Sequence, residues 1–265
     1  MGEKVAVVYF SQTGNTEKVA RGIAAGLETA GTSAELMRLE RTDPATLRNY
    51  DFFGIGTPVF YYKLPYNVAW FIKGLGGMTG KFAFGFLTEG GHAANTFRRM
   101  QRRLGRKGVT LVDTFKCLGF DTYPPFLGKD RQAGHPDETE LRAAEAFGAG
   151  LPGRRDRIRA GATELVPTFE KETGRFARLA VLLTRPMLSV VSPRKHVDRD
   201  RCTRCALCVE HCPTGNIRLA PRPRFGWRCV YCYHCERVCP EDAIVCDWTR
   251  MTRRVERHYP GDDSA

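Results

Sequence analysis

The chain has no long hydrophobic run and no low-complexity segment, and it has a single cysteine before Cys202. No stretch approaches the roughly 18 consecutive apolar residues that a membrane-spanning helix needs. The most apolar segment, 176–191, is interrupted by Arg178, Arg185 and Pro186. The N-terminal residues carry no long apolar signal core and run directly into a strand-like segment. We therefore expect a soluble, cytoplasmic protein.

The overall composition is that of an ordinary globular protein. Hydrophobic residues make up 42% of the 265 residues and charged residues 26%, which is too apolar for a disordered chain. The 27 glycines and 15 prolines are too few for a collagen-like chain. The length suits one large domain or two modest ones.

The ten cysteines are distributed very unevenly. One is Cys117, and the other nine lie between Cys202 and Cys246. A secreted protein held by disulfides would not confine its cysteines to one short segment. The distribution therefore indicates a reducing compartment and a metal site.

The first part of the chain alternates between strand-like and helix-like segments. Five apolar runs are typical of strands, and three segments between them are typical of helices. The strands are expected at 4–10, 34–39, 52–56, 82–87 and 109–118, and the helices at 16–30, 66–73 and 93–104. Since the strands are apolar on both faces, the predicted fold class is α/β, a doubly wound five-stranded parallel sheet. A helix over 137–160 would complete this domain, and 161–195 would form a connecting helix and linker.

An internal repeat occupies the cysteine-rich part. The pattern C-x-x-C-x-x-C-x-x-x-C-P occurs twice, with a shift of 27 residues. Three cysteines at this spacing can surround one cuboidal iron–sulfur cluster, and the fourth reaches the cluster of the other half. One 4Fe–4S cluster would take Cys202, Cys205, Cys208 and Cys239, and the other would take Cys229, Cys232, Cys235 and Cys212.

This segment resembles the bacterial two-cluster ferredoxins, and each ligand position of that pattern is filled. The resemblance implies a small C-terminal α+β domain. Structural zinc is the alternative, but it usually uses paired C-x-x-C knuckles rather than a run of four cysteines before proline. The other two cysteines, Cys117 and Cys246, are interpreted as buried inert thiols. His211 and His234 are not needed as ligands.

The first strand is followed by a polar loop and a helix, an arrangement that favours an anion. The loop lacks the Gly-Lys-Ser/Thr of a Walker loop and the G-x-G-x-x-G of a dinucleotide site. It resembles the flavodoxin phosphate loop, which binds the phosphate of FMN. That resemblance implies a site at Ser11, Gln12, Thr13, Gly14, Asn15 and Thr16. The alternative is a simple helix cap by Thr13 or Asn15.

Two later loops lie where the flavodoxin fold holds the flavin ring. They are Thr57, Pro58, Val59, Phe60, Tyr61 and Tyr62 after the third strand, and Thr88, Glu89, Gly90 and Gly91 after the fourth. Flavodoxins typically place an aromatic residue from each loop on the ring, but here only the first loop has aromatics. One ring face is therefore expected to be open. His92, beside the second loop, either tunes the flavin or caps the next helix.

The net charge of +12 predicts a partner with an acidic docking surface. The charge is +8 before Ser192 and +4 after it, and bound clusters and flavin phosphate would reduce the total to about +6. Two basic runs, 98–107 and 154–159, are either docking sites or solvated helix faces. No nucleic-acid module accompanies them, so nucleic acid is not an expected partner.

As a whole, the chain resembles the flavodoxin–ferredoxin fusions called EFR-type ferrodoxins. The expected domains are a flavodoxin-like part (1–160), a linker (161–195), a two-cluster ferredoxin part (196–250) and a tail (251–265). The resemblance implies an electron carrier that passes electrons between FMN and two 4Fe–4S clusters, to or from a redox partner. The alternatives are a flavin-dependent reductase of a small molecule, with the clusters as its electron wire, and a docking protein. A homodimer remains open.

Overall fold

The computed structural model describes residues 3–126 and 131–258, which form two compact units. The first unit comprises the chain up to Phe120 together with Gln132–Leu182. The second comprises Asp121–Arg131 and the chain from Leu183 onward. Short segments on either side of residue 120 therefore belong to different units.

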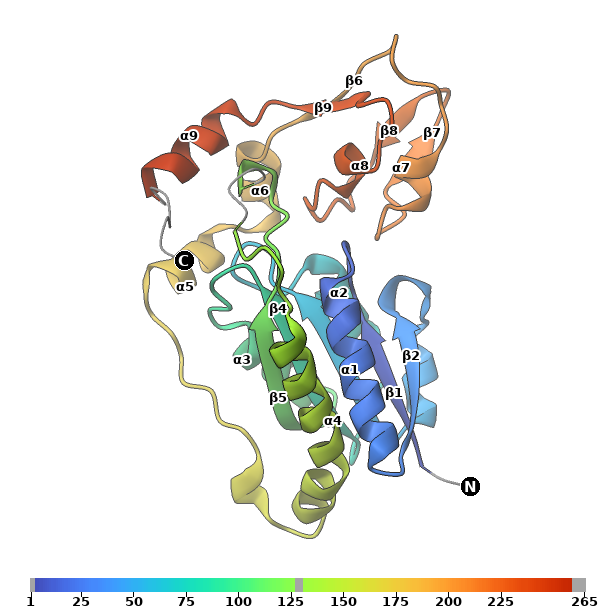
Figure 1. Ribbon diagram of the computed structural model, residues 1–265, viewed down its shortest axis with the longest axis vertical. Helices are drawn as coiled ribbons and strands as arrows, with labels where there is room; N and C mark the ends of the chain where they lie inside the picture. Colours follow the sequence, from blue (N-terminus) through green and yellow to red (C-terminus); the bar gives the residue numbers. More distant parts are fainter. Residues whose placement is uncertain (1–2, 127–130, 259–265) are drawn as a thin grey trace. The chain divides into compact units, whose positions relative to one another are not determined.

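The first unit is built on a five-stranded sheet whose strands are all parallel (Figure 1). The strands are β1 (Lys4–Tyr9), β2 (Ser33–Arg38), β3 (Phe52–Pro58), β4 (Phe82–Glu89) and β5 (Thr110–Leu118). Their order, β2-β1-β3-β4-β5, is that of the flavodoxin-like doubly wound sheet. The fold class predicted from the alternation of apolar runs is confirmed.

Helices cover both faces of this sheet (Figure 1). They are α1 (Asn15–Thr29), α2 (Tyr66–Gly74), α3 (Thr96–Gly105) and α4 (Glu138–Arg159). Alternate residues of the strands point to opposite faces. Val5 and Val7 therefore pack in one core with residues of α1 and α4, whereas Ala6 and Val8 pack in the other with residues of α2 and α3.

Small residues allow α1 and α4 to approach each other closely. A Cβ atom on Gly26 of α1 would lie 1.9 Å from the backbone oxygen of Glu145, and one on Gly148 of α4 would lie 2.2 Å from that of Ile23. The Asp137 side chain accepts a hydrogen bond from the Glu140 N–H at 2.8 Å and so caps the start of α4.

The segment after α4 contains two short helices rather than a single connecting helix. They are α5 (Arg175–Leu182) and α6 (Arg185–Val191), after a 3-10 turn at Thr163–Leu165. The helical path is interrupted because Pro186 occupies the first turn of α6, where it is tolerated, and Thr184 caps that turn. Helix α5 belongs to the first unit and α6 to the second.

The second unit contains two antiparallel strand pairs and short helices. β6 (Lys195–Val197) pairs with β9 (Ile244–Cys246), and β7 (Ile217–Leu219) pairs with β8 (Pro223–Phe225). The helices are α7 (Leu207–Glu210), α8 (His234–Arg237) and α9 (Thr249–His258), besides α6 and a 3-10 turn at Pro124–Phe126. Residues 251–258, expected as part of a tail, lie in α9, and the rest of that tail lies outside the described residues.

The sequence repeat is also a repeat of backbone conformation. Residues 27 positions apart adopt the same left-handed φ in three cases, namely Arg204 with Tyr231, Ala206 with Tyr233, and Gly215 with Asp242. α7 and α8, and likewise β7 and β9, are related by the same shift. The second unit is therefore two copies of one small motif.

Candidate functional site

The loop after β1 forms the entrance to helix α1. Gly14 has a φ of 96°, a value that favours glycine, and its N–H donates to the Ser11 hydroxyl at 3.1 Å. The N-cap residue of α1 is Gly14, which has no side chain to cap the first turn. The backbone N–H groups of that turn thus face the loop at the positive end of the helix dipole, which suits a phosphate. The alternative, a simple helix cap by Thr13 or Asn15, does not agree with Gly14 as the N-cap residue.

Side chains tie this loop to the ends of two other strands. The hydroxyls of Thr16 and Thr88 are hydrogen-bonded at 2.8 Å, and both residues are buried. The Asn15 side chain donates to the backbone oxygen of Phe120 at 3.3 Å. The phosphate loop is therefore held to the ends of β4 and β5 at the carboxyl edge of the sheet, and this is the edge where such sheets bind ligands.

The loop after β3 presents two tyrosines in a constrained conformation. Phe60 and Lys63 exchange backbone hydrogen bonds of 3.0 and 3.1 Å, and Tyr61 and Tyr62 between them have φ values of 51° and 61°. The Val59 N–H donates to the Thr88 oxygen at 3.0 Å, so this loop lies against the loop after β4. Left-handed φ values at tyrosine are costly and concentrate at binding sites.

The loop after β4 contains a buried carboxylate. Glu89 is 7% exposed, and its Oε1 lies 3.3 Å from Nζ of Lys116. Its other oxygen, Oε2, is buried without a hydrogen-bond partner among the described residues. A buried acceptor of this kind needs a donor. An N–H of a flavin ring would supply one, so the residues present fit that group.

One neighbour of these loops, Phe176 of α5, was not identified from the sequence. Its ring centre lies 4.9 Å from that of Tyr62 and 4.7 Å from that of His92. His92 accepts a hydrogen bond from the Ala94 N–H through Nδ1 at 2.9 Å, ahead of helix α3, whose N-cap residue is Asn95. Phe176 thus adds an aromatic ring beside the loop that has none of its own.

Further contacts hold the segment before α5 on helix α3. Asn95 and Glu172 exchange two hydrogen bonds of 2.9 Å, and the Gln101 side chain donates to the Pro167 oxygen at 2.6 Å. The rings of Phe97 and Phe169 stack with their centres 5.7 Å apart. This part of the expected linker is consequently fixed to the first unit along most of its length.

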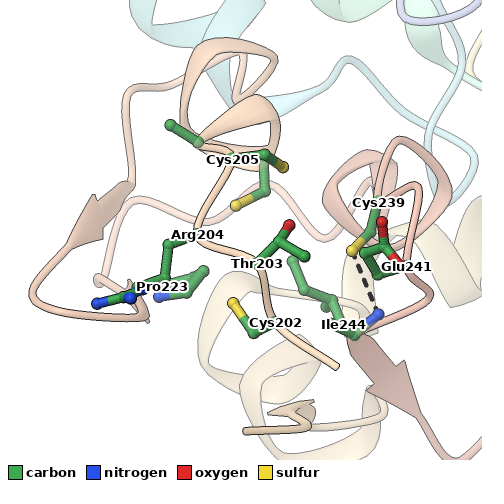
Figure 2. Close-up of a pocket in the computed structure, with 11 residues that line it drawn as sticks. Cys202, Thr203, Arg204, Cys205, Pro223, Cys239, Glu241 and Ile244 are labelled. Carbon is green, nitrogen blue, oxygen red and sulfur yellow. Dashed lines mark hydrogen bonds between the residues drawn. The ribbon is translucent and has the colours of Figure 1, made fainter. Parts of the chain in front are cut away.

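The second unit contains two cavities lined by cysteines. The first, here the Cys202 cavity, is surrounded by Cys202, Cys205, Cys208 and Cys239. Figure 2 shows three of these residues around one hollow, with the hydrogen bond of 3.2 Å from the Ala243 N–H to the Cys239 sulfur drawn as a dashed line. The second, here the Cys229 cavity, is surrounded by Cys212, Cys229, Cys232 and Cys235.

The structure therefore groups the eight cysteines as the spacing predicted, with the fourth cysteine of each repeat in the other repeat's cavity. The two cavities leave about 330 and 290 Å³ free of protein atoms, partly open to solvent. The backbone N–H groups of Asn216 and Tyr231 donate to sulfurs of the Cys229 cavity at 3.3 Å, and that of Ala243 donates to a sulfur of the Cys202 cavity at 3.2 Å. N–H groups directed at a cavity favour an anion. Four sulfurs around each hollow fit a cuboidal 4Fe–4S cluster.

Burial makes three of the eight cysteines poor thiolates without a metal. It raises the pKa of the Cys232 thiol to about 12, and it also raises the pKa of the Cys208 and Cys235 thiols. Metal binding requires the thiolate form and therefore releases these protons. The apolar cluster beside the cavities is small and is centred on two cysteines and on Ile217 and Ile244.

The two remaining cysteines line neither cavity. Cys117 is buried in β5 and Cys246 in β9, and burial raises the pKa of each thiol to about 12. These features agree with the interpretation of both as inert thiols. None of the helices in the described ranges combines the length and apolarity needed to cross a membrane.

Comparison with known families gives two matches. The family described as flavodoxin matches residues 7–143, and the 4Fe-4S dicluster domain matches residues 194–240. The chain belongs to the flavodoxin family and carries an iron–sulfur domain in the same polypeptide. The flavodoxin domain implies FMN, and the dicluster domain implies iron–sulfur clusters. The chain is therefore an electron-transfer flavo-iron–sulfur protein.

Individual relatives cover parts of the chain. An uncharacterised protein of Methanocaldococcus jannaschii is 28% identical over 140 residues, which are 52% of this chain and 89% of the relative. A probable iron-sulfur protein of the Frd operon of Proteus vulgaris is 28% identical over 96 residues, 26% of this chain and 61% of the relative. A solved flavodoxin from the domain Archaea has a TM-score of 0.47 at 19% identity, and the match covers 58% of this chain and 99% of that one.

Proposed function

We propose that this protein carries electrons between FMN and two 4Fe–4S clusters, and exchanges them with a redox partner protein. The observation that carries the proposal is the presence of two four-cysteine cavities in the same chain as a flavodoxin phosphate loop. FMN exchanges two electrons with a donor or acceptor, whereas clusters exchange one at a time. Joining them in one chain allows conversion between the two kinds of transfer.

Each cofactor would be held by its own set of residues. The backbone of the α1 first turn and the hydroxyls of Ser11, Thr13 and Thr16 would hold the phosphate without a cation. The 57–62 and 88–91 loops would hold the ring, with the free oxygen of Glu89 accepting a ring N–H. The eight cavity cysteines would each ligate iron.

The position of Phe176 favours a carrier over a reductase of small molecules. An open ring face was the main argument for an enzyme, because a substrate could reach the flavin there. Phe176 packs against Tyr62 and His92 on the side where the 88–91 loop provides no aromatic residue. This arrangement supports a covered flavin that exchanges electrons with proteins. Multiple turnovers of a small acceptor at rates unaffected by Phe176→Ala would contradict it.

The proposed partner surface is the basic face of α3. Met100 and Leu104 face the core, whereas Arg102, Arg103 and Arg106 are exposed. We expect Arg102→Glu with Arg103→Glu to slow electron transfer to an acidic partner at low salt, and the difference to disappear at high salt. An equal loss at all salt concentrations would point away from docking.

The test is stepwise anaerobic reduction of the purified protein, followed by absorbance and EPR, with iron and flavin counted per chain. The expected result is about eight irons and one FMN, with two interacting cluster signals. Iron without flavin would reduce the function to a ferredoxin carried on a docking domain.

Matched variants separate the two kinds of site. Cys208→Ser should damage the cluster of the Cys202 cavity and leave flavin binding intact. Cys246→Ser, a buried thiol of the same unit that lines neither cavity, should keep both cofactors. Thr13→Ala with Asn15→Ala should release the flavin and keep the iron. If Cys208→Ser or the loop variant abolishes both cofactors, the picture of two modules is wrong.

A further inference from the structure

The two cysteine cavities are related by the internal repeat, so differences between them are informative. The backbone N–H four residues after the crossing cysteine donates to its sulfur in both copies. Asn216 donates to Cys212 at 3.3 Å, and Ala243 donates to Cys239 at 3.2 Å. This backbone hydrogen bond is therefore shared by both cavities, while the Thr214 hydroxyl at 3.7 Å from Cys212 and the Tyr231 N–H at 3.3 Å from Cys229 are further partners at the Cys229 cavity.

A lysine breaks this symmetry at the Cys229 cavity. Nζ of Lys195, on β6, lies 3.6 Å from the sulfur of Cys229. It also lies 4.2 Å from the ring centre of Tyr233 and 5.6 Å from that of Tyr231. Aromatic faces attract cations and keep water away from this ammonium group.

By strand pairing, the equivalent position at the Cys202 cavity carries no charge. Arg222, which lies 27 residues after Lys195, donates to the backbone oxygen of Arg199 at 3.0 Å. Lys195 of β6 pairs with Cys246 of β9. The repeat equivalent of Cys246 is Leu219, 27 residues earlier, and Leu219 pairs with Pro223 of β8. Pro223 is therefore the structural counterpart of Lys195, and it lines the Cys202 cavity (Figure 2). A proline ring offers neither a positive charge nor an N–H.

Other charges near the cavities do not offset this difference. Arg204 and Glu241 both line the Cys202 cavity, but they are exposed and opposite in sign. At the Cys229 cavity, Arg237 lies on the short helix α8 together with Cys235, one of the four cysteines of that cavity. The repeat equivalent of Arg237 is Glu210, which has the opposite charge. Both differences add positive charge near the Cys229 cavity. The carboxylate of Glu236, also on α8, is turned to the Cys246 N–H and the Trp248 indole N–H, which donate to it at 3.0 and 3.1 Å.

We propose that Lys195 makes the two cluster sites electrically unequal, so that the first electron to enter resides at the Cys229 cavity. The inference rests on the proposed function, because it assumes a cluster at each site. Reduction adds one negative charge to a cluster without forming or breaking a bond, and a neighbouring cation stabilises that charge. The electron comes from the flavin or, in the test below, from a low-potential chemical reductant such as dithionite.

The experiment is a potentiometric titration of the loaded full-length protein, followed by EPR. Lys195→Met removes the charge and keeps the length of the side chain, whereas Lys195→Arg keeps the charge. Arg250→Met is the control, since it removes an equal charge from an exposed position of α9 in the same unit. Hyperfine-shifted NMR signals of ¹³C-labelled cysteine show which cavity's sulfurs respond at each step.

Lys195→Met should lower the equilibrium constant for reducing the cluster at the Cys229 cavity at least tenfold. For one electron, this corresponds to a reduction potential that is lower by about 59 mV. The other cluster should change much less, and Lys195→Arg and Arg250→Met should resemble the wild type. Equal shifts of both clusters, or a shift as large in Arg250→Met, would overturn the inference. If Lys195→Met no longer holds the cluster of the Cys229 cavity, Lys195→Arg still tests the order in which the two clusters are reduced. This variant keeps the positive charge, so its first electron must still reside at the Cys229 cavity.

The inference and the proposed function fail in distinguishable ways. Wild-type protein that holds no iron at the eight cysteines overturns both. Wild-type protein with both clusters, in which the Cys202 cavity is reduced first, overturns the inference alone.

Discussion

Lys63 follows the 57–62 loop and is a buried lysine whose titration should be measurable. It is 8% exposed, and its Nζ donates to the backbone oxygen of Ala180 at 3.3 Å. Burial, and secondarily the charge of Arg99, lower the pKa of Lys63 from 10.5 to about 8. The lysine therefore stays largely charged at neutral pH, at a cost to the folded state.

The size of that cost follows from the shift in pKa. A lowering from 10.5 to about 8 corresponds to about 3 kcal/mol of unfolding free energy. Between these two pH values the folded state binds fewer protons than the unfolded state, so stability rises with pH across this window. Lys63→Met should remove that rise. At pH 7 it should gain about 2 kcal/mol, because it avoids the buried charge but loses a hydrogen bond worth about 1 kcal/mol.

The assay has two parts. NMR of lysine labelled with ¹³C at the ε carbon should show one side chain titrating near pH 8, and that signal should be missing in Lys63→Met. Arg99→Gln should raise this pKa. Urea unfolding, followed through the amide signals of β1 and β3 at several pH values, gives the stability difference. Lys63→Arg, which cannot deprotonate, is the control and should lack the rise above pH 8. A measured pKa of 10 or more for Lys63 would refute the reasoning.

Other predictions concern packing, the phosphate loop and iron. Gly26→Ala should destabilise the first unit by about 1–3 kcal/mol in urea unfolding, because its Cβ would collide with the Glu145 oxygen. Gly150→Ala, in open space on the same helix pair, should instead stabilise it by about 0.5–1 kcal/mol, and equal effects would contradict this account. Thr16→Val should cost about 1 kcal/mol and weaken FMN binding, measured by flavin fluorescence, because it leaves Thr88 without its partner; unchanged affinity would argue against the site. Iron chelation should unfold the second unit, seen by circular dichroism and amide exchange, while the first keeps its protected amides.

Local sequence was sufficient for much of the candidate site. The cysteine spacing predicted how the eight sulfurs group around two cavities, because three of each four lie in one short loop whose backbone conformation the neighbouring residues set. The apolar alternation predicted the parallel sheet, since buried strands and their covering helices have distinct periods. The position of the phosphate loop followed from its place between a strand and a helix.

Contacts between distant segments were not accessible in this way. Phe176 lies beside Tyr62 and His92 only because the segment before it is fixed to α3 by hydrogen bonds and stacked rings. The assignment of residues 121–131 to the second unit likewise has no signal in their composition. Such contacts depend on where whole elements pack, and many sequences with the same pattern could pack differently.

The sequence by itself determined that this protein can hold a flavin and iron–sulfur clusters, since ligand type and spacing are local properties of the chain. The tertiary structure decided that the two cavities are unlike. Lys195 and Cys229 are 34 residues apart, and only the antiparallel pairing of β6 with β9 brings the ammonium group to that sulfur. A repeat in sequence fixes which sulfurs surround each cavity, whereas the electric field in the cavity comes from charges that folding brings near it.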